Sequence, residues 1–281
     1  MNQGRDKPRR FPLPLDKLQA SPARDARAPA VSRELLRPQL HLQQAAKDAA
    51  RQTPPSGLGL DSAGVRLRMV QRLRAEGLQD ERVLDALSRV PRHEFVDSAL
   101  AIQAYEDTSL PIGHEQTISK PSVVGRMIAL LMAGASASQS GHLGRVLEIG
   151  TGCGYQAAVL ALLGRRLSSI ERLLPLHEKA RSNLAGLRLS GVRLVYGDGR
   201  LGDPAMAPFD SIIAAAGGDD IPPAWLAQLA PGGRLVAPMQ APSGRGQVLV
   251  VIDHVQGLQG SQFVRSLQEA VLFVPLKSGV M

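Results

Sequence analysis

The sequence predicts an α/β fold: a doubly wound, Rossmann-like, mostly parallel seven-stranded sheet with a C-terminal antiparallel strand pair. Two observations favour this fold. From Arg145 onward, short apolar runs alternate with segments of helical periodicity, which is typical of parallel β–α units with helices on both faces of a sheet. After Pro238 the helical segments disappear. The last two strands are therefore expected to pair antiparallel at the edge of the sheet.

Residues 1–60 differ in composition from the rest of the 281-residue chain. They contain 8 of the 20 prolines and 11 Lys/Arg against 5 Asp/Glu, and they show no sustained apolar period. Such a segment buries too little apolar surface to offset the entropy lost on ordering. We expect a disordered basic tail with at most a transient helix near Ser32–Gln52. A mitochondrial-type presequence is the alternative, which the interrupting aspartates disfavour.

Residues 61–281 are expected to form one folded domain that begins with a helical part, 61–135. Apolar residues recur at helical spacing over Val65–Leu73, Val83–Leu87 and Val123–Met132. The second of these segments ends shortly before Pro91.

Seven strands are expected between Arg145 and Pro275. They are the runs Arg145–Ile149, Leu167–Ile170, Val192–Tyr196, Asp210–Ala214, Arg234–Pro238, Gln247–Ile252 and Ala270–Pro275. Helices are expected around Gln156–Leu163 and Leu174–Leu187, between the first three strands. The carboxyl ends of parallel strands share one edge of the sheet, and open α/β sheets bind ligands at that edge.

Composition disfavours several classes of protein. The chain has no run of about 18 apolar residues, so no membrane span is expected, and no apolar segment follows the basic N-terminus to make a secretory signal. One cysteine, Cys153, and six scattered histidines predict no disulfide and no metal site. Residues 61–281 hold 22 basic against 20 acidic residues, which disfavours nucleic-acid binding. We expect a cytoplasmic monomer.

A glycine loop follows the first expected strand and precedes a helix. It reads Glu148-Ile149-Gly150-Thr151-Gly152-Cys153-Gly154, and glycines let a backbone approach a ligand closely at a helix N-terminus. A dinucleotide site would read G-x-G-x-x-G, whereas this loop reads G-x-G-x-G after an acid. That acid suits the cationic amino group of a methionine moiety. We predict S-adenosyl-L-methionine as cofactor, bound by Glu148, Gly150, Thr151, Gly152 and Gly154.

Two further acids follow the second and third expected strands. Glu171 has the offset from the glycines that is expected for an acid on ribose hydroxyls, and Asp198, followed by Gly199, stands where a carboxylate can meet the adenine edge. Each feature alone has an ordinary explanation, as a packing loop, a solvated strand end or a turn cap. Their order at three successive strand ends favours the cofactor.

Several segments resemble the protein-L-isoaspartate O-methyltransferases, a family of class I methyltransferases. The most specific is the run from Ala104 to Pro121, which contains Leu-Pro-Ile-Gly followed by Thr-Ile-Ser-x-Pro. Other blocks that resemble the family are Val90–Val96, Val146–Tyr155, Gly197–Gly199, Phe209–Ile213 and Phe273–Leu276. The resemblance is collinear over residues 65–278 and does not include residues 1–60.

The resemblance implies methylation of the free carboxylate of L-isoaspartyl residues in damaged proteins and peptides, which is a protein-repair reaction. It makes Ser119 the site residue and places Thr117 and Ile118 in a substrate groove formed by the 61–135 segment. A carboxylate is ionised at neutral pH, so the transfer needs no general base, only proximity and in-line geometry. From the pattern alone, Ser119 is better explained as the N-cap of the helix that follows Pro121.

The chain departs from the family pattern at two places. Glu115 stands where the family usually has glycine, which puts a carboxylate near an anionic substrate. The loop Gly217–Asp220 is also unusually acidic.

Two other functions stay open from the sequence. One is a class I methyltransferase that acts on RNA or a small molecule, which the near-neutral 61–281 segment and the absence of an Asn/Asp-Pro-Pro-Tyr-like motif after Asp210–Ala214 disfavour. The other is an inactive adenosyl-binding module whose basic tail recruits a partner. Retention of Glu171, Asp198 and Ser119 disfavours that interpretation.

Overall fold

The computed structural model describes residues 63–257 and 260–281, so the expectations for residues 1–60 lie outside the described part of the chain. The described chain opens with helices α2 (Ala63–Ala75) and α3 (Glu81–Arg89), followed by two 3₁₀ helices, η2 (Arg92–Phe95) and η3 (Ser98–Gln103). Helices α2 and α3 confirm the helices that the sequence predicted there, whereas η2 and η3 were not predicted. Asp80 caps α3, because its side chain accepts the N–H groups of Arg82 and Val83.

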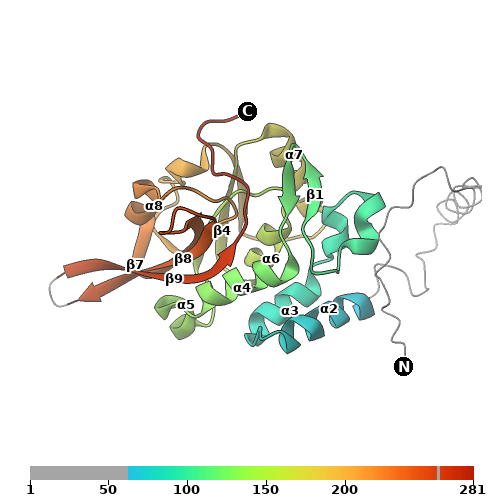
Figure 1. The fold of residues 1–281 in the computed structure, drawn as a ribbon, viewed down its shortest axis with the longest axis horizontal. Coiled ribbons are helices and arrows are strands. Elements are labelled where there is room, and N and C mark those ends of the chain that lie inside the picture. Colours follow the sequence, from blue (N-terminus) through green and yellow to red (C-terminus); the bar gives the residue numbers. More distant parts are fainter. Residues whose placement is uncertain (1–62, 258–259) are drawn as a thin grey trace, which may run out of the picture. The chain divides into compact units, whose positions relative to one another are not determined.

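A seven-stranded sheet forms the centre of the molecule (Figure 1). Its strands are β3 (Arg145–Ile149), β4 (Arg166–Glu171), β5 (Val192–Tyr196), β6 (Phe209–Ala214), β7 (Leu229–Gln240), β8 (Gln247–Gly257) and β9 (Gly260–Val271). Their spatial order is β5-β4-β3-β6-β7-β8-β9, parallel from β5 to β7 and antiparallel beyond. The strand order reverses between β3 and β6, which is where a doubly wound sheet opens a ligand crevice.

Alternate residues of the central strands enter two separate apolar clusters, one on each face of the sheet. In β3, Val146 belongs to one cluster and Leu147 to the other, and in β6 the same holds for Ile213 and Ile212. This alternation follows from the two-residue repeat of a strand. Because both faces are buried, the strands read as continuous apolar runs, and this is why the sequence located them.

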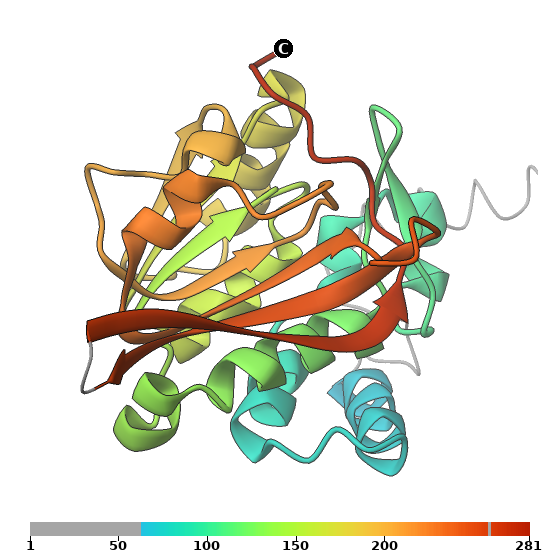
Figure 2. The ribbon, with the colours of Figure 1, turned by 60° about the vertical axis from the view of Figure 1, so that its left-hand side comes forward.

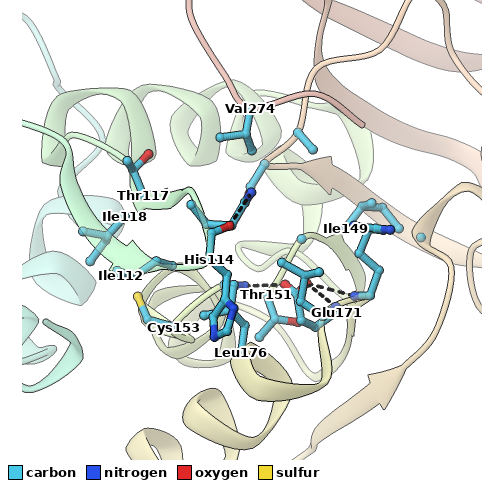
Figure 3. Close-up of a pocket in the computed structure, with 18 of the residues that line it drawn as sticks. Ile112, His114, Thr117, Ile118, Ile149, Thr151, Cys153, Glu171, Leu176 and Val274 are labelled. Carbon is cyan, nitrogen blue, oxygen red and sulfur yellow. Dashed lines mark hydrogen bonds between the residues drawn. The ribbon is translucent and has the colours of Figure 1, made fainter. Parts of the chain in front are cut away.

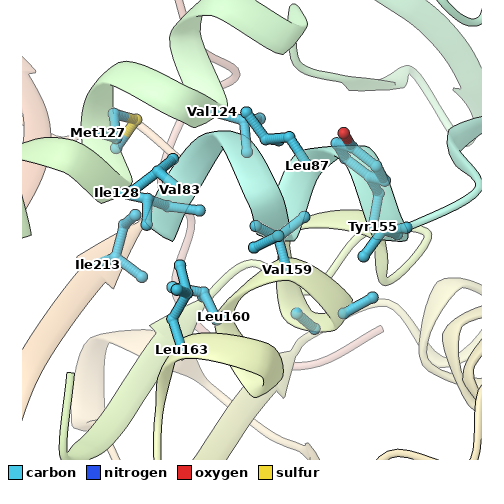
Figure 4. Close-up of a cluster of buried hydrophobic side chains, with 14 of the residues drawn as sticks. Val83, Leu87, Val124, Met127, Ile128, Tyr155, Val159, Leu160, Leu163 and Ile213 are labelled. Atoms are coloured by element: carbon cyan, nitrogen blue, oxygen red, sulfur yellow. The ribbon is translucent and has the colours of Figure 1, made fainter. Parts of the chain in front are cut away.

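Helices α2 to α7 contribute to the larger cluster, whose centre is drawn in Figure 4. Helix α3 packs against α6 (Tyr155–Leu163), and that view draws Val83 and Leu87 of α3 in the same cluster as Val159 of α6. The other helices of this set are α4 (Pro121–Met132), α5 (Ala135–Ser140) and α7 (Leu174–Ala185). The second face is covered by α8 (Pro223–Gln228), η4 (Gly199–Leu201) and loops, with the indole of Trp225 fully buried. The doubly wound prediction is confirmed.

The C-terminal strand pair differs in position from the prediction. The predicted strand Ala270–Pro275 overlaps β9 at only two residues, because β9 runs from Gly260 to Val271 and forms a long hairpin with β8 (Figure 2). Most of β9 is exposed and carries polar residues among the apolar ones. Strand β9 therefore has no buried apolar run from which a sequence pattern could locate it. The apolar residues that predict a strand at Ala270–Pro275 lie mostly in the segment that follows β9.

Two short strands, β1 (Leu110–Gly113) and β2 (Gln116–Ile118), form a separate antiparallel hairpin that the sequence did not predict. Among the described residues, no helix is long and apolar enough to cross a membrane. No group of three or more His, Cys, Asp or Glu side chains in the same part of the chain is placed to hold a metal ion.

Candidate active site

A cavity of 560 Å³ opens at the carboxyl ends of β3, β4 and β6, at the point where the strand order reverses. This volume lies within the range of small-molecule sites. Figure 3 shows Thr117 and Ile118 on one side of it and Thr151 and Glu171 on the other. We call Gly150–Gly152 with Glu171 the cofactor wall, and the hairpin β1–β2 with Ser119 the substrate wall.

The glycine loop gives the cofactor wall its shape. Gly150 and Gly152 line the cavity with φ angles of 88° and 57°, in the left-handed region that favours glycine. Thr151 lines it between them. Gly154 does not line the cavity: it lies behind the loop with φ 92° and forms the N-cap of α6. The loop therefore presents mainly backbone to a ligand.

Glu171 is the last residue of β4, and it lines the cavity although only 5% of its surface is exposed. Its Oε2 accepts the N–H of Gly152 at 2.8 Å, and its Oε1 accepts the N–H groups of Arg172 and Leu173 at 2.9 and 3.0 Å. A carboxylate offers about four acceptor positions, so these three bonds fix its orientation and leave one position for a ligand hydroxyl.

Glu148 lies one layer behind the wall and is fully buried. Its Oε2 accepts a hydrogen bond from the Ser169 hydroxyl at 2.5 Å, and its Oε1 accepts one from Gln156 Nε2 at 3.0 Å. The Ser169 hydroxyl is 2.6 Å from that of Thr151, which does line the cavity, as does Gln156. Burial raises the pKa of Glu148 to about 8, against these hydrogen bonds, which lower it. Glu148 is therefore connected to the cavity only through hydrogen bonds, by Ser169 to Thr151 and directly to Gln156.

Asp198 also lies outside the cavity lining, whereas its neighbour Gly199 lines it. The carboxylate of Asp198 accepts the N–H of Arg200 at 2.9 Å and that of Gly279 at 2.6 Å. A Cβ at Gly199 would lie 2.5 Å from Cγ2 of Ile149, so glycine is required for the close approach there. The backbone N–H of Gly279 thus takes up one acceptor position of the Asp198 carboxylate.

The substrate wall is formed by β2 and the residues that follow it. Thr117 is exposed, Ile118 is buried and Ser119 is half-buried, and all three line the cavity. Lys179 of α7 holds the hairpin from behind, since its Nζ donates to the Ile112 carbonyl at 3.1 Å. The three substrate residues and the cofactor wall therefore face one space.

Ser119 is not the N-cap of α4. The N-cap position is Lys120, whose side chain makes no capping hydrogen bond. The first turn is capped instead by Asp107, 15 residues upstream, which accepts the Ser122 N–H at 2.9 Å and the Ser122 hydroxyl at 2.7 Å. The Ser119 carbonyl accepts a bond from the buried Arg92 at 2.7 Å. The capping function that pattern alone gave to Ser119 thus belongs to Asp107.

The donor set of the cavity fits S-adenosyl-L-methionine. A carboxylate fixed at the end of β4 suits ribose hydroxyls, and a wall of glycine backbone lets the ligand approach closely. Thr151 and Gln156 offer neutral polar atoms, backed by Glu148, for a cationic amino group. These residues are able to hold the cofactor.

Comparison with known proteins decides the family. The sequence model of the family described as protein-L-isoaspartate(D-aspartate) O-methyltransferase matches residues 66–281. The chain belongs to this family. A relative from Methylibium petroleiphilum with the name protein-L-isoaspartate O-methyltransferase is 60% identical over 99% of both chains. One of the same name from Leptothrix cholodnii is 55% identical over 96% of this chain and 94% of its own.

Solved structures agree with this assignment. A protein-L-isoaspartate O-methyltransferase structure is 28% identical and covers 76% of this chain and 67% of its own, with a TM-score of 0.66. A putative family member from Plasmodium falciparum, solved with S-adenosyl-L-homocysteine, has a TM-score of 0.61 at 21% identity and covers 75% of this chain and 98% of its own. The second likeness supports the fold alone.

The departure from the family at Glu115 has a structural counterpart. His114 and Glu115 form the two-residue turn between β1 and β2, and both have positive φ, 52° and 58°. Two-residue hairpin turns of this kind favour glycine because both central residues are left-handed. In this isoaspartyl methyltransferase Glu115 adopts that backbone conformation, is exposed and lines the cavity.

Sequence reasoning missed three parts of this family member's site. Tyr155, the segment Val274–Lys277 and Met281 line the cavity, and Arg92 supports its substrate wall. Tyr155, Arg92 and Val274–Leu276 all lie in blocks that resemble the family, but an isolated tyrosine or arginine, or a short apolar run, carries no signal of a site. The closing segment reaches the cavity through long-range backbone bonds, such as Leu276 N–H to the Gly217 carbonyl at 2.7 Å.

Proposed function

We propose that this chain transfers the methyl group of S-adenosyl-L-methionine to the free carboxylate of L-isoaspartyl residues in damaged proteins and peptides, with Ser119 as the residue that binds this carboxylate. The family assignment supports the reaction. The single observation that supports the site is that one cavity is lined both by the glycine loop with Glu171 and by Thr117, Ile118 and Ser119. A methyl donor and its acceptor must share such a space.

The chemistry asks little of the protein beyond position. When bound, the cofactor would supply an electrophilic methyl group on its sulfonium, since breaking the sulfur–methyl bond releases S-adenosyl-L-homocysteine as a neutral thioether. The isoaspartyl carboxylate is already ionised at neutral pH and needs no general base. The Ser119 hydroxyl donates a hydrogen bond to one carboxylate oxygen and so directs the other toward the methyl group. The buried Ile118 excludes water from the reacting oxygen, and Thr117 lines the groove beside it.

The cofactor residues have separate roles in this proposal. Glu171 accepts a ribose hydroxyl at its remaining acceptor position, and Gly150, Thr151, Gly152 and Gly154 shape the loop that approaches the methionine part. Glu148 acts through Thr151 and Gln156 on the amino group. Asp198 and Gly199 lie at the adenine end, with one Asp198 oxygen bonded to Gly279.

The wider setting is also part of the proposal. We place the enzyme in the cytoplasm as a monomer that does not bind nucleic acid, with the 1–60 tail outside the catalytic domain. The near-balanced charge of residues 61–281 supports the absence of nucleic-acid binding. The only cysteine, Cys153, is buried, and burial raises the pKa of its thiol, which supports a structural residue suited to a reducing compartment.

The experiment is methyl transfer from radiolabelled cofactor to a pair of peptides that differ only in one residue, L-isoaspartate or L-aspartate. We expect base-labile label in the isoaspartyl peptide and none in its partner. Equal labelling of both peptides, or label only in RNA or small molecules added in parallel, would overturn the proposal. Absence of any transfer, with cofactor binding intact, would favour an adenosyl-binding module.

A further inference from the structure

Arg92 is a fully buried cation directly behind the substrate wall. It has no exposed surface, and its guanidinium donates to three carbonyl groups from separate parts of the chain. The bonds are Nε to Ala104 at 2.8 Å, Nη2 to Ser119 at 2.7 Å and Nη2 to Thr108 at 3.4 Å. Arg92 therefore ties the backbone of Ser119 to the loop that precedes β1.

The charge of Arg92 has no direct counter-ion among the described residues. Its Nη1 makes no hydrogen bond there. The carboxylate of Asp107 acts on it electrostatically, but the oxygens of that carboxylate are taken by Ser122. Burial lowers the pKa of Arg92, against the interactions with Tyr155 and Cys153 that raise it. An arginine stays protonated under such conditions, so a net positive charge persists inside the protein.

This charge lies one side chain away from the cavity. The guanidinium carbon of Arg92 is 4.7 Å from the centre of the Tyr155 ring, and Tyr155 lines the cavity together with Ser119. A neutral donor would satisfy carbonyl groups at less cost, because a buried charge is expensive unless it is paired. An anion bound at Ser119 would provide the missing negative charge in a region of low dielectric.

We propose that Arg92 is a positioning residue for the methyl transfer: it fixes the backbone of Ser119 and supplies the positive charge that favours the isoaspartyl carboxylate over neutral groups. The proposal rests on the proposed function, since it assigns Arg92 to the same substrate. It predicts that the charge of Arg92 acts on peptide binding and leaves cofactor binding almost unchanged.

The test compares Arg92→Met and Arg92→Lys in the full chain, with Arg126→Met as the matched control. Arg126 is an exposed arginine of α4 that pairs with Glu269 at 2.9 Å. Met removes the charge, whereas Lys keeps it and loses the forked geometry. For each folded variant we would measure KM and kcat with the isoaspartyl peptide, the Kd of S-adenosyl-L-homocysteine and the thermal midpoint.

We expect Arg92→Met to raise the peptide KM about tenfold or more, which corresponds to about 1.4 kcal/mol of lost binding free energy. Arg92→Lys should recover most of that loss, and the Kd of S-adenosyl-L-homocysteine should stay within about twofold in both. A structural strut alone would lower the midpoint equally in Lys and Met, with no charge-dependent difference in KM. Equal KM values for the two variants would overturn the proposal.

A second variant keeps the proposal testable even where Arg92→Met does not fold. Asp107→Asn removes the carboxylate charge that acts on Arg92. It keeps one oxygen to accept the Ser122 N–H, and its NH2 group can donate to the Ser122 hydroxyl oxygen in place of the bond that this hydroxyl now donates. With less compensation, the charge of Arg92 should lower the peptide KM by about threefold. An unchanged or raised KM in folded Asp107→Asn contradicts the electrostatic role. Failure of the wild-type enzyme to methylate the peptide at all would instead contradict the proposed function.

Discussion

The two walls of the cavity are built in different ways. The cofactor wall stands at the ends of buried parallel strands, and its carboxylate and glycine loop are fixed by short bonds such as Gly152 N–H to Glu171. The substrate wall is a hairpin of four- and three-residue strands whose turn has two non-glycine residues with positive φ. One wall is part of the core, and the other is attached to it by side chains.

This difference suits the two ligands. The cofactor is a single molecule, so a wall fixed by the sheet binds it with little reorganisation. The substrate is a protein segment of variable sequence, so its wall has an exposed face, while Leu110, Ile112, Ile118 and the Ser119 backbone are anchored inward. We expect substitutions in the cofactor wall to affect stability or cofactor affinity, and those in the substrate wall to affect turnover and peptide binding.

The largest effect is expected from Glu148, behind the cofactor wall. Its pKa of about 8 lies above the value of 4.5 for a free glutamate, so the folded state holds a proton that the unfolded state releases between these pH values. The free energy of unfolding must therefore fall as pH rises from 4.5 to 8, by about 1.4 kcal/mol per pH unit and about 5 kcal/mol in all. Glu148→Gln should remove this dependence.

Urea unfolding of wild type and Glu148→Gln across that pH range measures the effect. Other titrating groups contribute equally to both proteins, so the difference in free energy isolates Glu148. The variant should gain stability relative to wild type up to pH 8 and keep a constant advantage above it. A difference that does not change with pH would show that Glu148 is ionised in the folded protein.

The second effect concerns the substrate wall. Ser119→Ala should lower kcat on the isoaspartyl peptide by about 10- to 100-fold, since a hydrogen bond to a charged group contributes roughly 1.5–3 kcal/mol. Because Asp107 caps α4, we expect little change in the thermal midpoint. The matched control is Ser122→Ala, which loses the hydroxyl bonded to Asp107 and should be less stable but fully active. Normal turnover in Ser119→Ala would exclude contact with the carboxylate.

The third effect returns to the cofactor wall. Glu171→Ala should raise the cofactor Kd by about tenfold or more, which corresponds to about 1.4 kcal/mol, and leave the peptide KM nearly unchanged at saturating cofactor. Glu178→Ala, at an exposed acid of α7, controls for loss of a negative charge. Calorimetry with unchanged affinity in folded Glu171→Ala would show that this carboxylate only braces the loop through Gly152.

The same contrast explains what the sequence could predict. The strand Arg145–Ile149 and the helices α4 and α6 lie within two residues of their predicted bounds, because buried runs and helical periods are local signals. The hairpin β1–β2 has strands too short for a period. Two contacts of the site join residues that are far apart in sequence: Asp107 caps α4 at Ser122, and Arg92 binds the Ser119 carbonyl. The burial of Glu148 depends in the same way on elements that pack around it. No local pattern reveals such contacts.

The smallest effect is expected at Glu115, at the tip of the substrate wall. A side chain held at φ 58° costs about 1–2 kcal/mol, whereas glycine adopts this conformation freely and loses about 0.5–1 kcal/mol through its more flexible unfolded state. Glu115→Gly should therefore stabilise the protein by up to about 1 kcal/mol and raise the thermal midpoint by a few degrees. Glu115→Gln keeps the strained backbone and removes only the charge. Since Glu115 lines the cavity in which we propose that the anionic substrate binds, both variants should lower the peptide KM by a similar, small factor, and only Glu115→Gly should raise the midpoint. A midpoint that rises equally in Glu115→Gln would show that the Glu115 charge, and not its left-handed backbone, destabilises the turn between β1 and β2.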